Sequence, residues 1–210
     1  MGCSSNDVEE VNINQNNKIE KGINDSQLKK FENGNYIGEL KKDKMDGNGI
    51  FYYNNGDRYE GNYKNGKKEG KGKYFYKNGN RYEGDFKNDK FNGKGKFFWN
   101  NGDKFEGEYV NDKIEGKGIY YYFNGDKYDG EWKSDIREGK GIFYWDNGNR
   151  YEGEYKNDIR EGKGILYFKN GNRYEGEFKN DKLDGKGKFY YKDGKCENHV
   201  YKEDALISRS

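Results

Sequence analysis

The sequence predicts an all-β fold, an elongated and twisted antiparallel meander of stacked β-hairpins that stays open in the manner of a solenoid. Three observations predict it. The chain of 210 residues holds 37 aromatic residues and 32 glycines but no proline, and 37% of its residues are charged. One motif recurs every 23 residues without a slip. Within the motif, aromatic and charged residues alternate with the period of a half-buried strand.

The repeat unit begins with an aromatic residue that is followed two positions later by glycine. A Gly-x-Gly pair and a turn glycine complete the unit. The net charge is only +2, whereas disordered chains of low hydrophobicity usually carry a high net charge. A regular phase of this kind indicates an ordered repeat array. The seven units begin at residues 36, 59, 82, 105, 128, 151 and 174.

The sixth unit illustrates the expected elements. Tyr151, Gly153 and Tyr155 share one parity and charged residues share the other, which predicts a first strand. A second short apolar stretch covers 164–169 and ends at an Asn-Gly pair. Asn-Gly is a strong hairpin signal, so we expect a tight turn there and a longer polar loop over 156–162.

The strand glycines predict how the core is built. A glycine inside a strand usually marks the close approach of a ring or of another backbone. We therefore expect each aromatic ring to lie over a glycine of a neighbouring strand. One unit cannot bury its own packed face, so stability is expected to come from contacts between neighbouring repeats. At about 4.8 Å per strand, the ribbon should be roughly 65–70 Å long.

The motif Tyr-x-Gly-x-aromatic, followed by Gly-x-Gly and a turn glycine, resembles the MORN (membrane occupation and recognition nexus) repeat over residues 36–196. The departures are small: Phe105 replaces the first Tyr of one unit, and Leu40 replaces the second aromatic of the first unit. Beyond the seventh unit, Glu197 and His199 stand where Tyr and Gly are expected. The resemblance implies an elongated hairpin array, found in scaffold, membrane-junction, ciliary and cytoskeletal proteins and as an appendage of enzymes.

Three segments follow from this pattern. Residues 1–30 are predicted to be a flexible acylated tether, 31–196 the repeat array, and 197–210 a degenerate cap with a carboxy-terminal tail. Residues 1–35 carry a net charge of −2, so they provide no polybasic patch. One myristoyl chain binds membranes only marginally, and stable anchoring therefore requires a second acyl chain.

The first residues predict lipidation. Removal of Met1 would expose Gly2 for N-myristoylation, and the adjacent Cys3 is the usual position for S-palmitoylation. Asn6 departs from the preferred Ser or Thr at this position. The alternative is an unmodified tail. No signal peptide opens the sequence, which favours the cytoplasmic side of a membrane.

In the second strand of each unit, two residues in succession are mostly aromatic and therefore point to opposite faces of the sheet. The second of the two forms a column of rings along the array. If it is exposed, it forms an aromatic ladder suited to a protein partner or to a second copy of the chain, giving a homodimer. The alternative is that strand twist and the neighbouring rings bury both columns. The candidate partner-binding residues are Tyr52, Phe75, Phe98, Tyr121, Tyr144, Tyr167 and Tyr190.

A column of cations opens the first strand of successive units. It is a candidate site for phospholipid headgroups, consisting of Arg58, Arg81, Lys104, Lys127, Arg150 and Arg173. The alternative is a solvated face with cross-strand charge pairs. Residues 36–196 carry only +5 spread over seven units, which favours the solvated face. No basic patch is free of acids, so we expect no nucleic acid partner.

Catalytic and metal sites are not expected. The only histidine is His199, the only cysteines are Cys3 and Cys196, and threonine is absent. These residues compose neither a nucleophile–base pair nor a zinc site. The recurring Gly-Lys-Gly lacks the Ser or Thr of a phosphate loop. We expect no enzyme activity, cofactor, metal or small-molecule substrate.

The sequence therefore favours a non-enzymatic scaffold, held by acyl chains on the cytoplasmic face of the plasma membrane or an internal membrane. The repeats would offer a long surface to protein partners, including those of a membrane-associated cytoskeleton. Two alternatives remain. The repeats could bind phospholipid headgroups directly, or the chain could be a regulatory or cytoskeletal-assembly subunit in which the acyl motif is unused.

Overall fold

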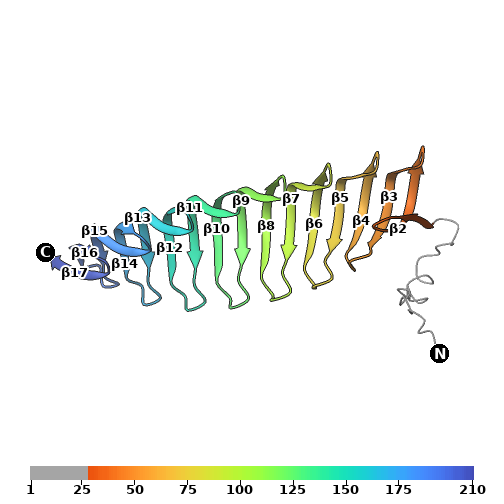
Figure 1. Cartoon of the computed structure of the whole chain (residues 1–210). Coiled ribbons are helices and arrows are strands. Elements are labelled where there is room, and N and C mark those ends of the chain that lie inside the picture. Colours follow the sequence, from red (N-terminus) through yellow and green to blue (C-terminus); the bar gives the residue numbers. More distant parts are fainter. Residues whose placement is uncertain (1–27) are drawn as a thin grey trace, which may run out of the picture.

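The computed structural model describes residues 28–210, which form one sheet of 17 antiparallel strands. Each strand pairs with the strands immediately before and after it in the chain. The sheet does not close on itself, and it runs as a long, twisted ribbon from β1 to β17 (Figure 1). The predicted open antiparallel meander is confirmed.

The strands alternate between two lengths inside the repeat array. Each unit from residue 58 onwards has a strand of seven residues followed by one of nine. The strands are β1 (Leu28–Phe31), β2 (Gly34–Lys41), β3 (Lys44–Tyr53), β4 (Arg58–Lys64), β5 (Lys67–Phe75), β6 (Arg81–Lys87), β7 (Lys90–Phe98), β8 (Lys104–Val110), β9 (Lys113–Tyr121), β10 (Lys127–Lys133), β11 (Ile136–Tyr144), β12 (Arg150–Lys156), β13 (Ile159–Tyr167), β14 (Arg173–Lys179), β15 (Lys182–Tyr190), β16 (Cys196–Lys202) and β17 (Ala205–Arg209).

The two ends of the array are strands as well. β1 begins at Leu28, inside the segment that the sequence assigned to the tether. β16 and β17 continue the sheet beyond the seventh unit, where the motif has decayed. His199 takes the place of a strand glycine in β16 and is buried against Phe189, with the two rings stacked at 5.2 Å. The sheet thus extends past the recognisable repeats in both directions.

The first aromatic residue of every unit forms the centre of the core. Tyr59 shows the arrangement: its ring lies over Gly61 and Gly72, which face each other on neighbouring strands. A Cβ atom placed on Gly72 would lie 2.4 Å from the Tyr59 hydroxyl. That hydroxyl donates a hydrogen bond to the Asn62 carbonyl at 3.0 Å. The expected packing of ring on glycine is confirmed for seven fully buried rings: Tyr36, Tyr59, Tyr82, Phe105, Tyr128, Tyr151 and Tyr174.

A second column of rings connects one repeat to the next. Phe86 meets Tyr82 of its own repeat at 5.2 Å and Tyr59 of the preceding repeat at 4.9 Å, both edge to face. Edge-to-face pairs are the favoured geometry for aromatic rings. The core is therefore a single line of interlocked rings along the ribbon, and each repeat is stabilised by its neighbours.

The turn lengths differ from the prediction. β12 and β13 are joined by a turn of only two residues, Asn157 and Asp158, with φ of 49° and 69°. The predicted longer loop over 156–162 is therefore wrong, because residues 159–162 are already strand. The Asn-Gly pair instead lies in a five-residue connection, in which Gly171 has φ of 91° and its amide donates to the Phe168 carbonyl at 2.9 Å.

The tight turn forms at Asn157-Asp158, and not at the Asn-Gly pair, because Asn and Asp tolerate the left-handed backbone conformation. Two consecutive left-handed residues make the mirror-image turn that matches strand twist, and this pair makes it without glycine. In the five-residue connection only Gly171 is left-handed, closing the loop before β14. The two-residue turn fixes the register of each hairpin, with Lys156 opposite Ile159.

Candidate functional site

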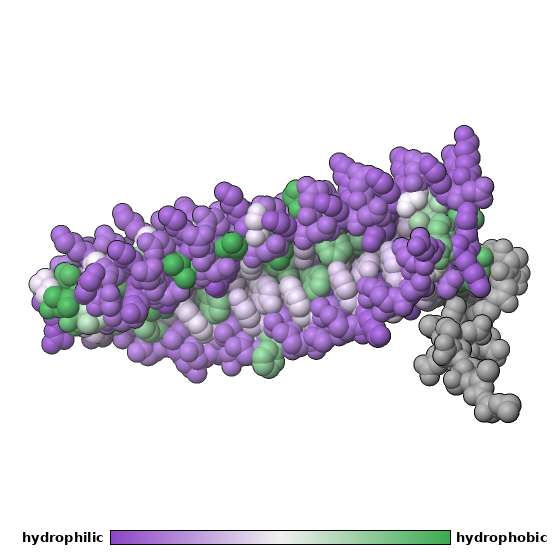
Figure 2. Space-filling model, viewed as in Figure 1, coloured by the Kyte–Doolittle hydropathy of each residue, from purple (hydrophilic) through white to green (hydrophobic). Residues whose placement is uncertain are grey.

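The face of the sheet opposite the buried rings is called the open face here. Its side chains are those of the other parity, such as Arg150, Glu152 and Glu154 on β12. They form three rows that cross the strands along the ribbon. Figure 2 shows hydrophilic side chains along both long edges of the molecule and a band of less polar residues between them.

The first row alternates rings and cations on successive strands, and we call it the cation–ring ladder. Arg150 lies opposite Tyr144 on one side and Tyr167 on the other. Its guanidinium carbon is 4.1 Å from the centroid of the Tyr167 ring. The same contact recurs in six repeats at 3.8 to 4.4 Å. The pairs are Arg58 with Phe75, Arg81 with Phe98, Lys104 with Tyr121, Lys127 with Tyr144, Arg150 with Tyr167, and Arg173 with Tyr190.

The ladder unites the two columns that the sequence had offered as separate sites. The seven rings of the predicted partner-binding column are half-buried, and six of them lie beneath a cation of the predicted headgroup column. Several of these cations also pair with an acid two residues later, as Arg81 does with Glu83 at 2.8 Å and Lys104 with Glu106 at 2.9 Å. Both binding assignments remain predictions, but they concern one composite surface.

The second row alternates acids with a residue that changes type along the array. In the second and third repeats this residue is lysine: Lys73 pairs with Glu83 at 3.6 Å, and Lys96 with Glu106 at 3.2 Å. Hydrogen bonds from Lys104 and from Lys96 lower the pKa of Glu106, although burial opposes the shift. The Glu106 carboxylate is therefore held charged by its two lysine partners.

In the fourth to sixth repeats isoleucine occupies the lysine position of the second row, and Lys188 returns to it in the seventh. Asp129 lies between Ile119 and Ile142, and Glu152 lies between Ile142 and Ile165. This change was not predicted from the sequence. The signal was present as Lys at 73 and 96 against Ile at 119, 142 and 165, one repeat apart each time.

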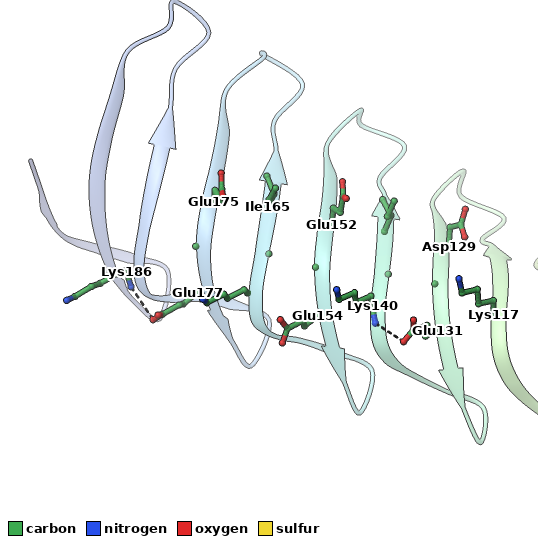
Figure 3. A pocket seen from close by; sticks show the side chains of 17 residues that line it. Lys117, Asp129, Glu131, Lys140, Glu152, Glu154, Ile165, Glu175, Glu177 and Lys186 are labelled. Carbon is green, nitrogen blue, oxygen red and sulfur yellow. Dashed lines mark hydrogen bonds between the residues drawn. The ribbon is translucent and has the colours of Figure 1, made fainter.

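The third row pairs lysines with acids across the strands. Lys71 forms an ion pair with Asp85 at 2.7 Å, and the same register recurs for Lys117 opposite Glu131 and Lys140 opposite Glu154. The Glu131 carboxylate accepts a hydrogen bond from the Lys140 backbone amide at 3.2 Å, drawn as a dashed line in Figure 3. Charges in this row are balanced locally.

The second and third rows line a groove over β9–β15 with a volume of about 860 Å³. Its lining includes six carboxylates, four lysines, Ile142 and Ile165, and it runs from Lys117 to Lys186 (Figure 3). Gly141, Gly153 and Gly164 are among its lining residues. A volume of this size is typical of ligand-binding clefts.

The remaining sequence-based candidates lie elsewhere. Gly2 and Cys3 lie outside the described residues. Cys196 is a free, exposed cysteine. Within residues 28–210, no group of His, Cys, Asp and Glu side chains is arranged to hold a metal ion. The same part of the chain contains no helix that is long and apolar enough to cross a bilayer.

Comparison with known families identifies the repeat. The MORN repeat family matches seven successive segments: residues 36–58, 59–81, 82–104, 105–127, 128–150, 151–173 and 174–196. The chain belongs to the MORN repeat family. The predicted unit boundaries agree with these segments. Among curated proteins, no sequence match to this MORN protein was found.

Two solved structures show similarity to this chain. One is the TCP domain of SAS-4 from Drosophila melanogaster in complex with a proline-rich motif of Ana2, with a TM-score of 0.50 and 14% identity, covering 75% of this chain and 87% of that chain. Another is the TCP10 domain of Danio rerio CPAP, with a TM-score of 0.33 and 13% identity, covering 87% of this chain and 98% of that chain. At such identities the likeness concerns the fold.

Proposed function

We propose that this MORN protein is a non-enzymatic scaffold that binds partner proteins along its open face. The cation–ring ladder carries the proposal, because it continues through six repeats with the side chains that protein interfaces favour, namely Tyr, Phe and Arg. The adjoining groove adds a concave surface. The SAS-4 domain, whose fold is similar, was solved in complex with a proline-rich motif of Ana2, and this supports a protein-binding role.

The experiment for this proposal is quantitative co-purification from cells with matched variants of the full chain. The double substitution Arg150→Ala/Arg173→Ala removes two cations of the ladder. The control Lys169→Ala/Lys192→Ala removes the same charge from exposed loops between strands. We expect the ladder variant to lose specific partners and the control to retain them. Equal recovery of all partners by the two variants would contradict the proposal.

We further propose that the scaffold is held on the cytoplasmic face of the plasma membrane or an internal membrane by a myristoyl group on Gly2 and a palmitoyl group on Cys3. The sequence motif supports this, and a single chain would bind only marginally. Gly2→Ala should release the protein into the cytosol, and Cys3→Ser should weaken its retention. If Gly2→Ala stays on the membrane, the repeats or a partner provide the attachment.

The second candidate is direct binding of phospholipid headgroups, and the unbroken column of six cations favours it. Against it, each cation covers a ring, and Arg58, Arg81, Lys104 and Arg150 also pair with acids. Flotation of the unacylated chain with anionic vesicles at physiological salt distinguishes the candidates. The scaffold proposal predicts no binding, and binding that Arg150→Ala/Arg173→Ala abolishes would favour headgroup recognition.

A further inference from the structure

We propose that the groove over β9–β15 binds an extended, polyproline-type segment of a partner protein that carries Lys or Arg at every third residue. The inference rests on the proposed scaffold function and names the chemistry of the partner. It combines a charge imbalance in one row of the open face, a match of spacing, and apolar side chains placed between the charges.

The imbalance lies in the second row. In the early repeats, Glu83 pairs with both Arg81 and Lys73, and Glu106 pairs with both Lys104 and Lys96. Within residues 28–210, neither Asp129 nor Glu175 makes an ion pair, whereas Glu152 has a pair only with Arg150 at 3.6 Å. Asp129 and Glu152 have thus lost the lysine neighbour that the early acids have, and Glu175 lies opposite Lys188 without forming an ion pair with it.

Apart from the pair of Arg150 with Glu152, the neighbouring cations of the ladder and the third row have partners of their own. Lys127 and Arg173 of the ladder are held over Tyr144 and Tyr190, at 4.2 and 3.8 Å from the ring centroids. Lys117, Lys140 and Lys163 of the third row lie in register with Glu131, Glu154 and Glu177 of their own row. The groove as a whole is lined by six acids and four lysines. A partner segment with basic side chains is therefore complementary to it.

The spacing of the acids selects the conformation of that segment. Equivalent positions in successive repeats are two strands apart, or about 9.6 Å. A polyproline helix has three residues per turn and rises about 3.1 Å per residue, or about 9.3 Å per turn. A segment lying along the ribbon presents every third side chain to Asp129, Glu152 and Glu175 in turn. A β-strand repeats about every 6.7 Å and would lose this register.

Between the acids, the groove presents apolar side chains that suit the partner residues lying between its lysines or arginines. Ile142 and Ile165 alternate with the three carboxylates and offer apolar contact to proline or another apolar residue. Rings of the ladder run beside this row, and proline-rich segments commonly dock against aromatic-lined grooves. The groove therefore provides charge, apolar surface and rings at the same period.

The test is fluorescence anisotropy with the full chain and three labelled peptides of equal length. The first has four Pro-Pro-Lys triplets, the second has four Pro-Pro-Glu triplets, and the third has the composition of the first with all lysines gathered at one end. We expect the first to bind at least ~10-fold more tightly than either of the others, and to weaken with added salt.

A pair of reciprocal variants locates the site. Ile142→Lys/Ile165→Lys gives the later repeats the residue that Lys73 and Lys96 provide in the early ones, so the fold accommodates it. We expect this variant to lose affinity for the first peptide about 10-fold, because the acids regain internal partners. Lys73→Ile/Lys96→Ile is the matched control and should retain or increase affinity.

The inference is overturned if the gathered-lysine peptide binds as tightly as the triplet peptide, or if Ile142→Lys/Ile165→Lys binds like the wild type. Its failure is distinguishable from failure of the scaffold function. If the peptide does not bind but Arg150→Ala/Arg173→Ala still loses its cellular partners, the open face remains a protein-binding surface and only the partner chemistry is wrong.

Discussion

Arg150 and Tyr167 lie opposite each other on neighbouring strands, with the guanidinium carbon 4.1 Å from the ring centroid. They are 17 residues apart in the chain, and the two-residue turn at Asn157 and Asp158 sets their register. The contact converts two simple columns, one of rings and one of cations, into one surface that repeats along the ribbon. That surface is the basis of the proposed protein-binding role.

Removal of one ladder cation should have a small effect on stability. Arg150→Ala is expected to lower the free energy of unfolding by about 0.5–1 kcal/mol, the usual value of a cation–ring contact at an exposed site. Arg150→Lys should retain most of it, since Lys127 occupies the same position over Tyr144. Urea denaturation provides the measurement. A loss above about 2 kcal/mol would show that Arg150 is a core residue instead.

The close approach of ring and glycine predicts a larger effect. A Cβ atom on Gly164 would lie 2.5 Å from Tyr151 Cε2, so Gly164→Ala should destabilise the chain by about 1–3 kcal/mol through overpacking. Gly66→Asp is the control, because Gly66 has free space around it and Asp158 occupies the equivalent turn position with φ of 69°. The two melting temperatures should differ clearly, and equal values would contradict ring-on-glycine packing.

The two-residue turns provide a third prediction. Asn157 has φ of 49°, which most side chains adopt only at a cost of about 1 kcal/mol or more. Asn157→Ala should therefore destabilise the chain, whereas Asn157→Gly should be close to neutral, because glycine adopts this region freely. Thermal unfolding of both variants checks the expectation. A more stable Ala variant would mean that the turn is not left-handed.

The sequence predicted two strands per unit, the unit boundaries and the packing of rings such as Tyr59 on Gly61 and Gly72, because parity and period depend only on local spacing. It placed the second strand of the sixth unit at 164–169, whereas β13 spans Ile159–Tyr167. It mispredicted the turns, since Asn157-Asp158 forms the tight turn without glycine. Because the turns were mispredicted, the cross-strand register could not be predicted. That register places Arg150 over Tyr167 and Ile142 between Asp129 and Glu152. Which residues face each other across two strands depends on the length of the turn between them, so the pattern within one strand does not predict it.

Lys68 gives a prediction with a pH dependence. Its ammonium group lies 4.7 Å from the Tyr74 ring and within 6 Å of three more rings, and burial lowers its pKa below the usual 10.5, although nearby aspartates oppose the shift. The same repeat position holds Ile114 and Leu183 in other units. Lys68→Leu should therefore raise the free energy of unfolding by about 1 kcal/mol at neutral pH.

The sign of the pH effect follows from the lowered pKa. Below its folded-state pKa the buried lysine is charged and costs stability, and this cost is relieved as the pH rises from that pKa toward 10.5. The advantage of Lys68→Leu over the wild type should shrink over that range. Paired urea titrations at pH 7 and about pH 10 measure the difference. An advantage that grows with pH would contradict the burial of a charged Lys68.

The most direct measurement for the protein-binding role is site-specific photo-crosslinking in cells. A photoreactive phenylalanine analogue placed at Tyr167 reports on the open face, and the same residue at Phe123, a loop side chain that is 76% exposed, is the control. The scaffold account predicts crosslinks to defined protein partners at position 167 that are absent at position 123. No protein crosslinks at 167, or the same set of proteins at both positions, would contradict it.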